Sequence, residues 1–490
     1  MSSRLARIFM IAMGALAFAW AVFRACVQSV VGDEAITYIW WVRPVTPEHW
    51  QASPNNHILN SLLMRASIAA FGLSHVTLRA PALLSAAVFI GVAFWFSRRI
   101  SDDWKIQVPL FLCLVYNPFV FDFFVAARGY GLATALLMCA LAVSARWHLD
   151  RSGSPVRAAA ISSLLIGLSF TANFSFAFAD AFCLLLLLIW GLRAGAPRWK
   201  LLAAYSLPAM IVILAIPSSS LLEWRSGMLF YGAHSMREMT RSIMISVFQQ
   251  LNPFLVNPLL LGEGWRVRRF WLPSIGVLVL IQAIYLFAAR RKLTEDRSRW
   301  LVAIAGIAAG AAGGSLLVHW LSFRWFGLLL PLYRTALYLA PLATLLIGAL
   351  ASLAVSWRRR ALTGLLFVLA AWFLLSLRLS SFIEWEYDSE AKDAYYTAAN
   401  YAREHCIQDV AATWRYDAAL DFYRLYTGNT GVSKFTGNGK AEAGHDLYVL
   451  HGPDDIGFIQ AQKLNIVYNG LTTDIVIAVR PSAVCEISGR

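Results

Sequence analysis

Two adjacent acids, Asp33 and Glu34, follow the first long apolar segment, in the stretch VVGDEAITYIWW at residues 30–41. Ionisable groups at membrane depth are costly and usually face a cavity or a charged partner, so the pair is a candidate to carry chemistry. Neighbouring side chains on a helix point about 100° apart, so only one of the two faces a given cavity. The alternative is that both are helix-start acids that the helix dipole stabilises.

A second polar cluster follows Pro54, where the chain turns back toward an apolar stretch. His57 can donate to a phosphate group, and Asn56 can hydrogen-bond sugar hydroxyls. The alternative is a solvated turn in which an asparagine caps the helix that begins at Ile58.

A third cluster lies in a short connection between two apolar segments and contains Asp122, Arg128 and Tyr130. Gly129 and Gly131 leave the backbone accessible there, and the guanidinium of Arg128 offers a fork of donors suited to a phosphate. The alternative is an ion pair between Asp122 and Arg128 that closes a hairpin.

Arg334 begins a late apolar segment. Its side chain either snorkels to lipid headgroups or reaches into the same cavity as Arg128. The nine histidines are scattered, without an HExxH motif or a CxxC pair, so the sequence predicts no metal site and leaves a dependence on divalent metal open. Gly-rich phosphate loops are also absent, which argues against nucleotide hydrolysis and against direct use of nucleotide sugars.

The composition is that of a polytopic membrane protein. Hydrophobic residues make up 59% of the 490 residues and charged residues 14%, against roughly 25% charged in soluble domains. The net charge of +14 comes from Lys and Arg in short loops between apolar runs, which is typical of membrane topology. The sequence has no basic stripe with interleaved aromatic residues outside the membrane segments, so we expect no nucleic-acid partner.

Apolar runs of about 17–25 residues predict about eleven transmembrane helices and a cytoplasmic amino terminus. They lie near residues 6–27, 76–97, 106–121, 129–147, 158–174, 176–192, 201–217, 271–289, 300–320, 336–356 and 361–378. Alternate connections are rich in Lys and Arg, which places them in the cytoplasm.

The remaining connections are then external, and two of them, 28–75 and 218–270, are long. Within the first, residues 58–71 favour an interfacial helix that lies along the membrane. The second is either a lid or binding loop, or an interfacial aromatic belt.

The sequence predicts two domains, a transmembrane domain at 1–381 and an external soluble α/β domain at 382–490. Short strand-like runs at 410–414, 447–450, 466–468 and 475–479 alternate with helical runs at 416–426 and 454–463. Cys406 and Cys485 are the two cysteines of this tail. If the tail faces an oxidising compartment, we expect them to form a disulfide.

Five motifs occur in an order that resembles the C-type superfamily of integral-membrane glycosyltransferases. They are GDEA at 32–35, NNHILNSLLMRASIAAFG at 55–72, LRAPALLSA at 78–86, FDFFVAARGYGLA at 121–133 and LPLYRTALYLAPL at 330–342. The similar branch is that of the protein O-mannosyltransferases and lipid A aminoarabinose transferases. Relatives often have His-Pro-Pro or Lys-Pro-Pro in the second motif, where this chain has Asn56-His57-Ile58.

The resemblance implies transfer of a sugar from a polyprenyl-phosphate carrier to an acceptor hydroxyl on the external face. The departing phosphate needs cationic and hydrogen-bonding partners, for which Arg128, His57 and Arg334 are the candidates, with Asn56 and Tyr130 as further substrate-binding residues.

The acceptor must lose a proton, which requires a carboxylate base. Asp33 is the first candidate and Glu34 the second, and Asp122 either orients the acceptor or shares the task. One carboxylate without a covalent intermediate implies inversion at the anomeric carbon.

The expected partners are membrane lipids, the lipid-linked donor, and a glycolipid, envelope polysaccharide or protein acceptor, with no tightly bound cofactor. The expected location is the bacterial inner membrane, with the site and the tail on the periplasmic side. Two other functions stay open: a flippase or transporter for lipid-linked sugars, because intramembrane ions also mark substrate paths, and a non-catalytic membrane scaffold.

Overall fold

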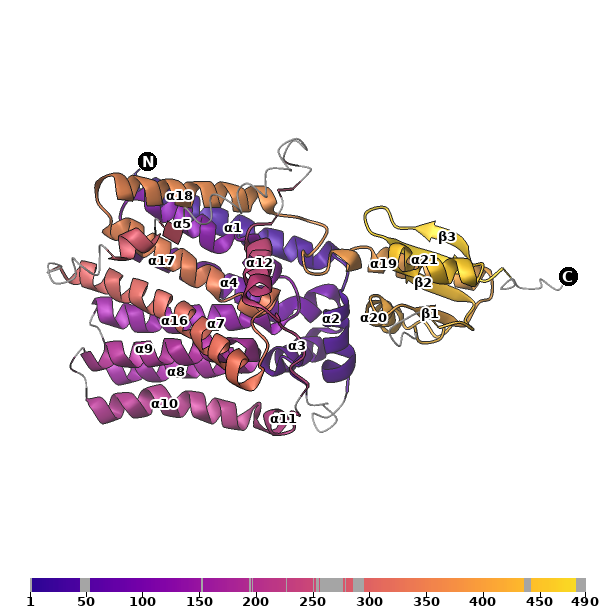
Figure 1. Ribbon diagram of the computed structural model, residues 1–490, viewed down its shortest axis with the longest axis horizontal. Coiled ribbons are helices and arrows are strands. Elements are labelled where there is room, and N and C mark those ends of the chain that lie inside the picture. The colour runs from indigo at the N-terminus through magenta and orange to yellow at the C-terminus, as the bar shows by residue number, and fades with distance from the viewer. Residues whose placement is uncertain are drawn as a thin grey trace. The chain divides into compact units, whose positions relative to one another are not determined.

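The computed structural model describes residues 2–44, 53–150, 153–193, 195, 197–225, 227–249, 251–252, 255, 276–277, 279–284, 295–435 and 442–481 (Figure 1). The chain forms two compact units. The helical unit consists of Met1–Val22, Ala52–Asn60 and Pro81–Leu377, and the mixed unit of Phe23–Gln51, Ser61–Ala80 and Arg378–Arg490. The mixed unit therefore joins the predicted soluble tail to two early segments of the chain.

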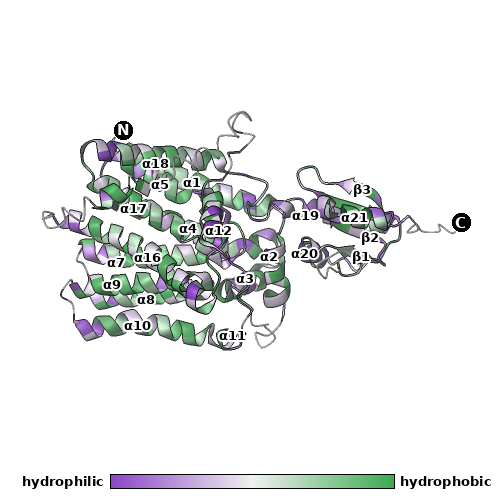
Figure 2. Cartoon of the chain, in the orientation of Figure 1, coloured by the Kyte–Doolittle hydropathy of each residue, from purple (hydrophilic) through white to green (hydrophobic). Residues whose placement is uncertain are grey.

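Within the described residues, nine helices are long and apolar enough to cross a membrane (Figure 2). Seven are the single helices α1 (Ser3–Val27), α4 (His75–Ile100), α7 (Gly129–Asp150), α8 (Pro155–Ala172), α10 (Arg198–Ala215), α16 (Asp296–Phe326) and α18 (Ser356–Ser376). The other two, Phe174–Arg193 and Tyr333–Leu353, each add a preceding 3-10 turn to α9 (Ala177–Arg193) and α17 (Leu339–Leu353). This confirms the predicted polytopic helical architecture.

Local signals set several helix ends. The side chain of Ser154 accepts from the backbone N–H of Arg157, and Pro155 occupies the first position of α8. At the other end of a long helix, Gly327 adopts φ +70 and stops α16 after 31 residues.

The predicted segment 106–121 is not one helix. It is divided into α5 (Trp104–Val115) and the short α6 (Pro118–Asp122), because the side chain of Asn117 caps α6 and Pro118 occupies its first turn. The predicted segment 271–289 lies largely outside the described residues. The prediction of eleven crossings is therefore untested.

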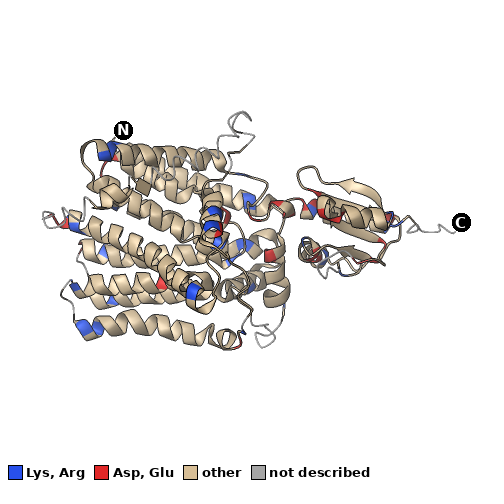
Figure 3. Ribbon diagram, in the orientation of Figure 1, with Lys and Arg blue, Asp and Glu red and all other residues tan. Residues whose placement is uncertain are grey.

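Three ion pairs join connections that the sequence assigns to the cytoplasm, which places these connections at one end of the helical unit. The pairs are Arg297 with Asp102, Arg359 with Asp103 at 3.0 Å and Arg99 with Asp150 at 3.8 Å. Basic residues gather at several of the helix ends (Figure 3). Since α7 ends at Asp150, its first residue Gly129 lies at the opposite end of the bundle.

Shorter elements complete the helical unit. They include η3 (Phe174–Phe176), α11 (Ser218–Leu222), α12 (Met236–Val247) and η6 (Tyr333–Ala336). The helix α3 (Ile58–Phe71) has the bounds predicted for the interfacial helix. Its first three residues belong to the helical unit and the rest to the mixed unit.

The mixed unit contains a four-stranded sheet in the order β1-β2-β4-β3. The strands are β1 (Val410–Ala412), β2 (Leu447–His451), β3 (Asn465–Asn469) and β4 (Ile475–Val479). The pair β1 and β2 is parallel, and the other two pairs are antiparallel. The sheet confirms the four predicted strands.

The helical runs predicted at 416–426 and 454–463 correspond to α20 (Asp417–Thr427) and α21 (Gly452–Ala461). The mixed unit also contains α2 (Gly32–Thr37), the π-helical η1 (Tyr38–Val42), η7 (Glu386–Asp388) and α19 (Ala391–Glu404). Gly428, at φ +65, ends α20. Cys485 lies outside the described residues, so its disulfide with Cys406 stays a prediction.

Early and late parts of the chain are interleaved in the mixed unit. The guanidinium of Arg24 donates to the carbonyl of Ser381 at 3.0 Å, and the backbone N–H of Val30 donates to the hydroxyl of Tyr423 at 2.8 Å. The rings of Tyr38 and Phe422 meet edge to face, with centroids 5.4 Å apart. The segment that carries the acid pair is thus packed against the tail domain.

Candidate active site

Glu34 and Arg79 form a bidentate ion pair in which both side chains are fully buried. The Nε and Nη2 of Arg79 donate to the two carboxylate oxygens of Glu34 at 2.9 and 2.7 Å. The other guanidinium contacts are to the carbonyls of Ala25, Gln28 and Ser29, at 3.0, 3.1 and 2.7 Å. Glu34 also accepts from the backbone N–H of Val31 at 3.1 Å. Both charges are therefore compensated inside the mixed unit.

This ion pair separates the two adjacent acids. The carboxylate of Glu34 is occupied at both oxygens and has no access to solvent, whereas Asp33 is only half-buried. The sequence interpretation did not include Arg79 among the site residues. The signal that could have found it is an arginine within the apolar motif LRAPALLSA, because a charge there needs a partner.

Asp33 lies in the first turn of α2, where the helix dipole favours a negative charge. One of its carboxylate oxygens, Oδ2, accepts from the indole N–H of Trp385 at 3.3 Å. The preceding residue, Gly32, donates its backbone N–H to the carboxylate of Asp388 at 2.8 Å. Both partners come from the segment that begins the tail domain.

A second set of predicted residues meets in the helical unit around Arg128, whose side chain is fully buried. Its Nη2 donates to the backbone carbonyl of Asn55 at 3.3 Å and to the side-chain oxygen of the same residue. Nearby, the amide of Asn60 donates to the carbonyl of Ala127 at 3.2 Å. These bonds attach the turn at residues 53–57 to the connection before α7.

His57 is buried beside this arginine, and its Nδ1 lies 3.2 Å from the carbonyl oxygen of Ala172. A carbonyl can only accept, so Nδ1 carries the proton. Burial and then the charge of Arg128 lower the pKa of His57 well below its usual range, the carbonyl of Ala172 opposes this, and Arg334 adds to the lowering. His57 is therefore neutral, and its Nε2 presents a lone pair that suits a sugar hydroxyl better than a phosphate.

The motif Gly129-Tyr130-Gly131 owes its glycines to close packing. A Cβ on Gly129 would lie 1.9 Å from the carbonyl oxygen of Ala172, and one on Gly131 would lie 2.1 Å from that of Phe123. Between them, the ring of Tyr130 packs against the ring of His57 with centroids 4.9 Å apart. The glycines thus let the start of α7 approach its neighbours, which is a firmer reason for them than the accessible backbone expected from the sequence.

Replacing Gly129 by alanine should disturb the site while leaving most of the bundle folded. The new methyl group would overlap backbone atoms at Ala172, so the start of α7 must move away from His57. We expect a loss of about 1–3 kcal/mol in stability, measured by thermal unfolding in detergent. The matched control is Gly306→Ala in α16, where a Cβ would meet no atom within 4 Å. Equal unfolding temperatures for the two variants would contradict the packing argument.

The other predicted residues occupy distinct places in the helical unit. Asp122 is buried at the end of α6, where its backbone carbonyl accepts from Val125 and Ala126 at 3.1 and 2.9 Å. Asn56 is also buried, and its N–H donates to the carbonyl of Ser53 at 3.0 Å.

Arg334 belongs to a strained turn. The residue before it, Tyr333, adopts φ +45, a conformation that costs energy for a residue with a side chain. The backbone N–H of Tyr333 donates to the hydroxyl of Ser242 at 3.2 Å, and the guanidinium of Arg334 lies 4.6 Å from the centre of the Tyr231 ring. Residues of the long loop at 218–270 therefore hold this arginine.

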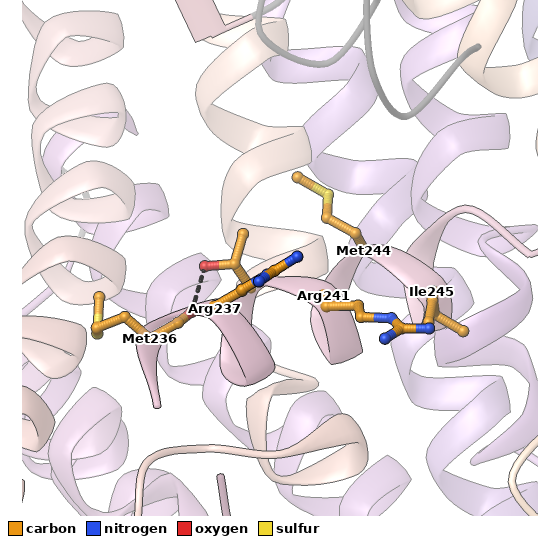
Figure 4. A pocket seen from close by; sticks show the side chains of 6 residues that line it. Met236, Arg237, Arg241, Met244 and Ile245 are labelled. Carbon is orange, nitrogen blue, oxygen red and sulfur yellow. Dashed lines mark hydrogen bonds between the residues drawn. The ribbon is translucent and has the colours of Figure 1, made fainter. Parts of the chain in front are cut away.

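The helix α12, which supplies Ser242, also has an exposed face. A groove of about 520 Å³ runs along it, lined by Met236, Arg237, Thr240, Arg241, Met244 and Ile245. Arg237 and Arg241 lie one turn apart on this face (Figure 4). The groove is thus apolar with two cationic groups, while the opposite side of α12 holds the Arg334 turn.

The predicted residues form two groups. In the helical unit, the ring of Tyr130 packs against the ring of His57, and Arg128 hydrogen-bonds to the nearby Asn55. The charges of Arg128 and Arg334 both lower the pKa of His57. Asp33 and Glu34 belong to the mixed unit. In the described part of the chain, no group of three or more His, Cys, Asp or Glu residues could hold a metal ion.

The fold defined by these elements is that of a polytopic helical membrane protein with a small α/β unit. One similar solved structure is that of ArnT from Cupriavidus metallidurans bound to undecaprenyl phosphate. It has a TM-score of 0.53 at 14% identity and covers 98% of each chain. This likeness confirms the fold that the sequence resemblance implied.

Two further structures are less similar, with lower TM-scores. ArnT from the same organism in the apo state has a TM-score of 0.40 at 13% identity, covering 96% of this chain and 97% of that one. Arabinofuranosyltransferase AftD from Mycobacteria has a TM-score of 0.41 at 14% identity, covering 97% of this chain and 40% of that one. No family model matches the chain, and no curated protein matches its sequence.

Proposed function

We propose that the protein transfers a sugar from a polyprenyl-phosphate monosaccharide to an acceptor hydroxyl at the external face of the membrane. The observation that carries this proposal is the position of Arg128, fully buried beside the neutral His57 and within the electrostatic reach of Arg334. The planar guanidinium of an arginine matches the geometry of a phosphate, and a lipid-linked phosphate is an anion that a membrane protein can recruit. The ArnT structure of the same fold holds such a lipid, undecaprenyl phosphate.

The chemistry divides between the two groups of residues. The sugar leaves behind a phosphate monoester, whose charge Arg128 and Arg334 stabilise through planar guanidinium donors. The acceptor hydroxyl loses its proton to Asp33, because Glu34 is committed to Arg79. Attack by the acceptor without a covalent enzyme intermediate inverts the anomeric carbon. His57 accepts a hydrogen bond from a sugar hydroxyl through Nε2.

The topology supports the external face. The basic connections that meet at one end of the bundle are assigned to the cytoplasm by the positive-inside rule. Gly129 and Ala172 lie at the other ends of α7 and α8, so the Arg128 cluster of Asn55, His57, Arg128 and Tyr130 belongs to the external side.

A reconstituted assay tests the function directly. Purified protein in proteoliposomes is incubated with a panel of labelled undecaprenyl-phosphate sugars and cell-envelope extract as the acceptor source. Label transferred to a new product with release of undecaprenyl phosphate supports the transferase. Movement of the intact donor across the bilayer supports a flippase, and neither event supports a scaffold. The glycan lost on gene deletion identifies the acceptor.

Arg128→Ala should weaken the binding of undecaprenyl phosphate by about 10- to 100-fold, because a charged hydrogen-bond donor to phosphate is lost. Arg128→Lys should fall between this variant and the wild type, because lysine keeps the charge without the planar fork. Quenching of intrinsic fluorescence by titrated undecaprenyl phosphate measures the affinity.

The control is Arg146→Ala, because that side chain is 70% exposed and only pairs with Asp150 on its own helix. It should bind the lipid as the wild type does. Unchanged affinity in a folded Arg128→Ala protein would refute the phosphate assignment.

A further inference from the structure

Residues at the start of the tail domain hydrogen-bond to Asp33 and to its neighbour Gly32. Trp385 is 3% exposed, and its indole N–H donates to Oδ2 of Asp33 at 3.3 Å. The carbonyl of Trp385 accepts from the backbone N–H of Asp388 at 3.0 Å, which closes the turn of η7. The ring of Phe382 packs edge to face on Trp385, with centroids 6.0 Å apart, and fixes the indole. A rigid donor therefore points at the proposed base.

Asp388 completes the arrangement on the other side of Gly32. Its side chain is fully buried, and its Oδ2 accepts from the N–H of Gly32 at 2.8 Å. Among the residues that the structure describes, its Oδ1 has no hydrogen-bond partner. Burial first, and then the nearby Asp33, Glu34 and Asp417, raise the pKa of Asp388 well above its usual range, against the bond from Gly32.

We propose that Trp385 and Asp388 are positioning residues of the transfer reaction, which together hold Asp33 in the orientation and the charged form that a general base requires. Trp385 acts by a hydrogen bond to the carboxylate, and Asp388 by fixing the backbone N–H of Gly32 at the start of α2. The inference rests on the proposed function, and in particular on Asp33 as the base.

The physical argument concerns two neighbouring carboxyl groups in different surroundings. A hydrogen bond to the ionised form of Asp33 stabilises that form, whereas a buried carboxyl with few partners keeps its proton. When the surroundings of two neighbouring acids differ in this way, one acid is ionised and the other keeps its proton. A neutral Asp388 also avoids placing a second negative charge beside the base.

Three charged or titratable groups of the mixed unit have their own surroundings. Glu34 is neutralised by Arg79, and the guanidinium of Arg415, next to α20, pairs with Asp454 at 2.6 Å. At the start of α20, burial is the main cause that raises the pKa of Asp417 to about 6. The hydrogen bond from Trp385 is a direct contact with the Asp33 carboxylate, and it stabilises the ionised form.

The test combines a readout that needs no acceptor with the transfer assay. Carbodiimide modifies protonated carboxyl groups. Labelling of Asp33 in the full-length protein across a pH series, followed by peptide mass spectrometry, therefore reports its titration midpoint, the pH at which half of Asp33 is protonated. In Trp385→Phe, which keeps an aromatic ring and loses the N–H, the midpoint should rise by about one pH unit. The turnover number kcat should fall about tenfold with KM unchanged.

Asp388 is tested in the same assays. Asp388→Ala should lower kcat and Asp388→Asn should restore most of it, because the amide oxygen can still accept from Gly32. The control for the tryptophan is Trp414→Phe, since Trp414 lies in the same unit and is 56% exposed. It should change neither the midpoint nor kcat.

The outcomes separate this inference from the function on which it rests. An unchanged midpoint and kcat in Trp385→Phe, with turnover lost in Asp33→Asn, would overturn the inference alone. Retained turnover in Asp33→Asn would overturn the base assignment and the inference with it. A raised midpoint with reduced kcat in Trp385→Phe, absent in Trp414→Phe, supports both.

Discussion

Asp33→Asn is expected to reduce sugar transfer by about 10²- to 10⁴-fold, the usual contribution of a general base. The amide cannot take a proton from the acceptor, while its oxygen can still accept from Trp385. Asp33 is half-buried in the first turn of α2, and asparagine has nearly the same size and shape, so the variant should fold and bind undecaprenyl phosphate normally. Transfer of labelled sugar and binding of the lipid are measured on the same preparation.

Two companion variants sharpen this experiment. Asp393→Asn removes an exposed acid on α19 of the same unit and should transfer sugar at the wild-type rate. Asp33→Glu keeps a carboxylate at a changed distance and should retain part of the activity. Near-normal transfer by Asp33→Asn would exclude Asp33 as the base and leave Asp122 as the next candidate for that role.

The second large effect concerns stability rather than chemistry. Glu34→Gln or Arg79→Ala leaves the other charge buried without its partner, which costs about 3–5 kcal/mol. For a unit of this size we expect the unfolding temperature to fall by roughly 10 °C or more. Thermal denaturation followed by fluorescence-detected size exclusion measures the loss.

A double variant distinguishes a lost charge from lost packing. Glu34→Leu combined with Arg79→Met removes both charges together and should be more stable than either single variant. Asp150→Asn serves as the control, because its pairs with Arg99 and Arg146 are solvent-exposed and worth about 1 kcal/mol at most. Wild-type stability of Glu34→Gln would show that the ion pair is not what holds this segment.

Local sequence signals predicted much of the fold. The apolar run at Ile475–Val479 is a fully buried strand, and the helical run predicted at 416–426 is α20. The division between α5 and α6 was also present in the sequence, as the asparagine and proline at 117 and 118. It was missed because the hydrophobicity continues across it.

The site residues were predicted by type but not by role. The pairing of Glu34 with Arg79 spans 45 positions, and the contact of Asp33 with Trp385 spans 352. Periodicity describes only near neighbours, so neither pair leaves a local signal. Likewise, the neutral state of His57 depends on its burial and on the charge of Arg128, and the position of its proton on the carbonyl of Ala172, all of which only the folded chain supplies.

The interleaving of the mixed unit has a consequence for biosynthesis. The chain emerges from the ribosome amino end first, so the acid pair is made long before its partners. The bonds from Arg24 to Ser381 and from Val30 to Tyr423 cannot form until the tail has been translated. A chain that stops before residue 378 contains both acids and Arg79 but lacks Trp385, the hydrogen-bond donor to the first acid. The arrangement around the first acid is therefore completed only when the last part has been synthesised, and we expect an interrupted chain to transfer no sugar.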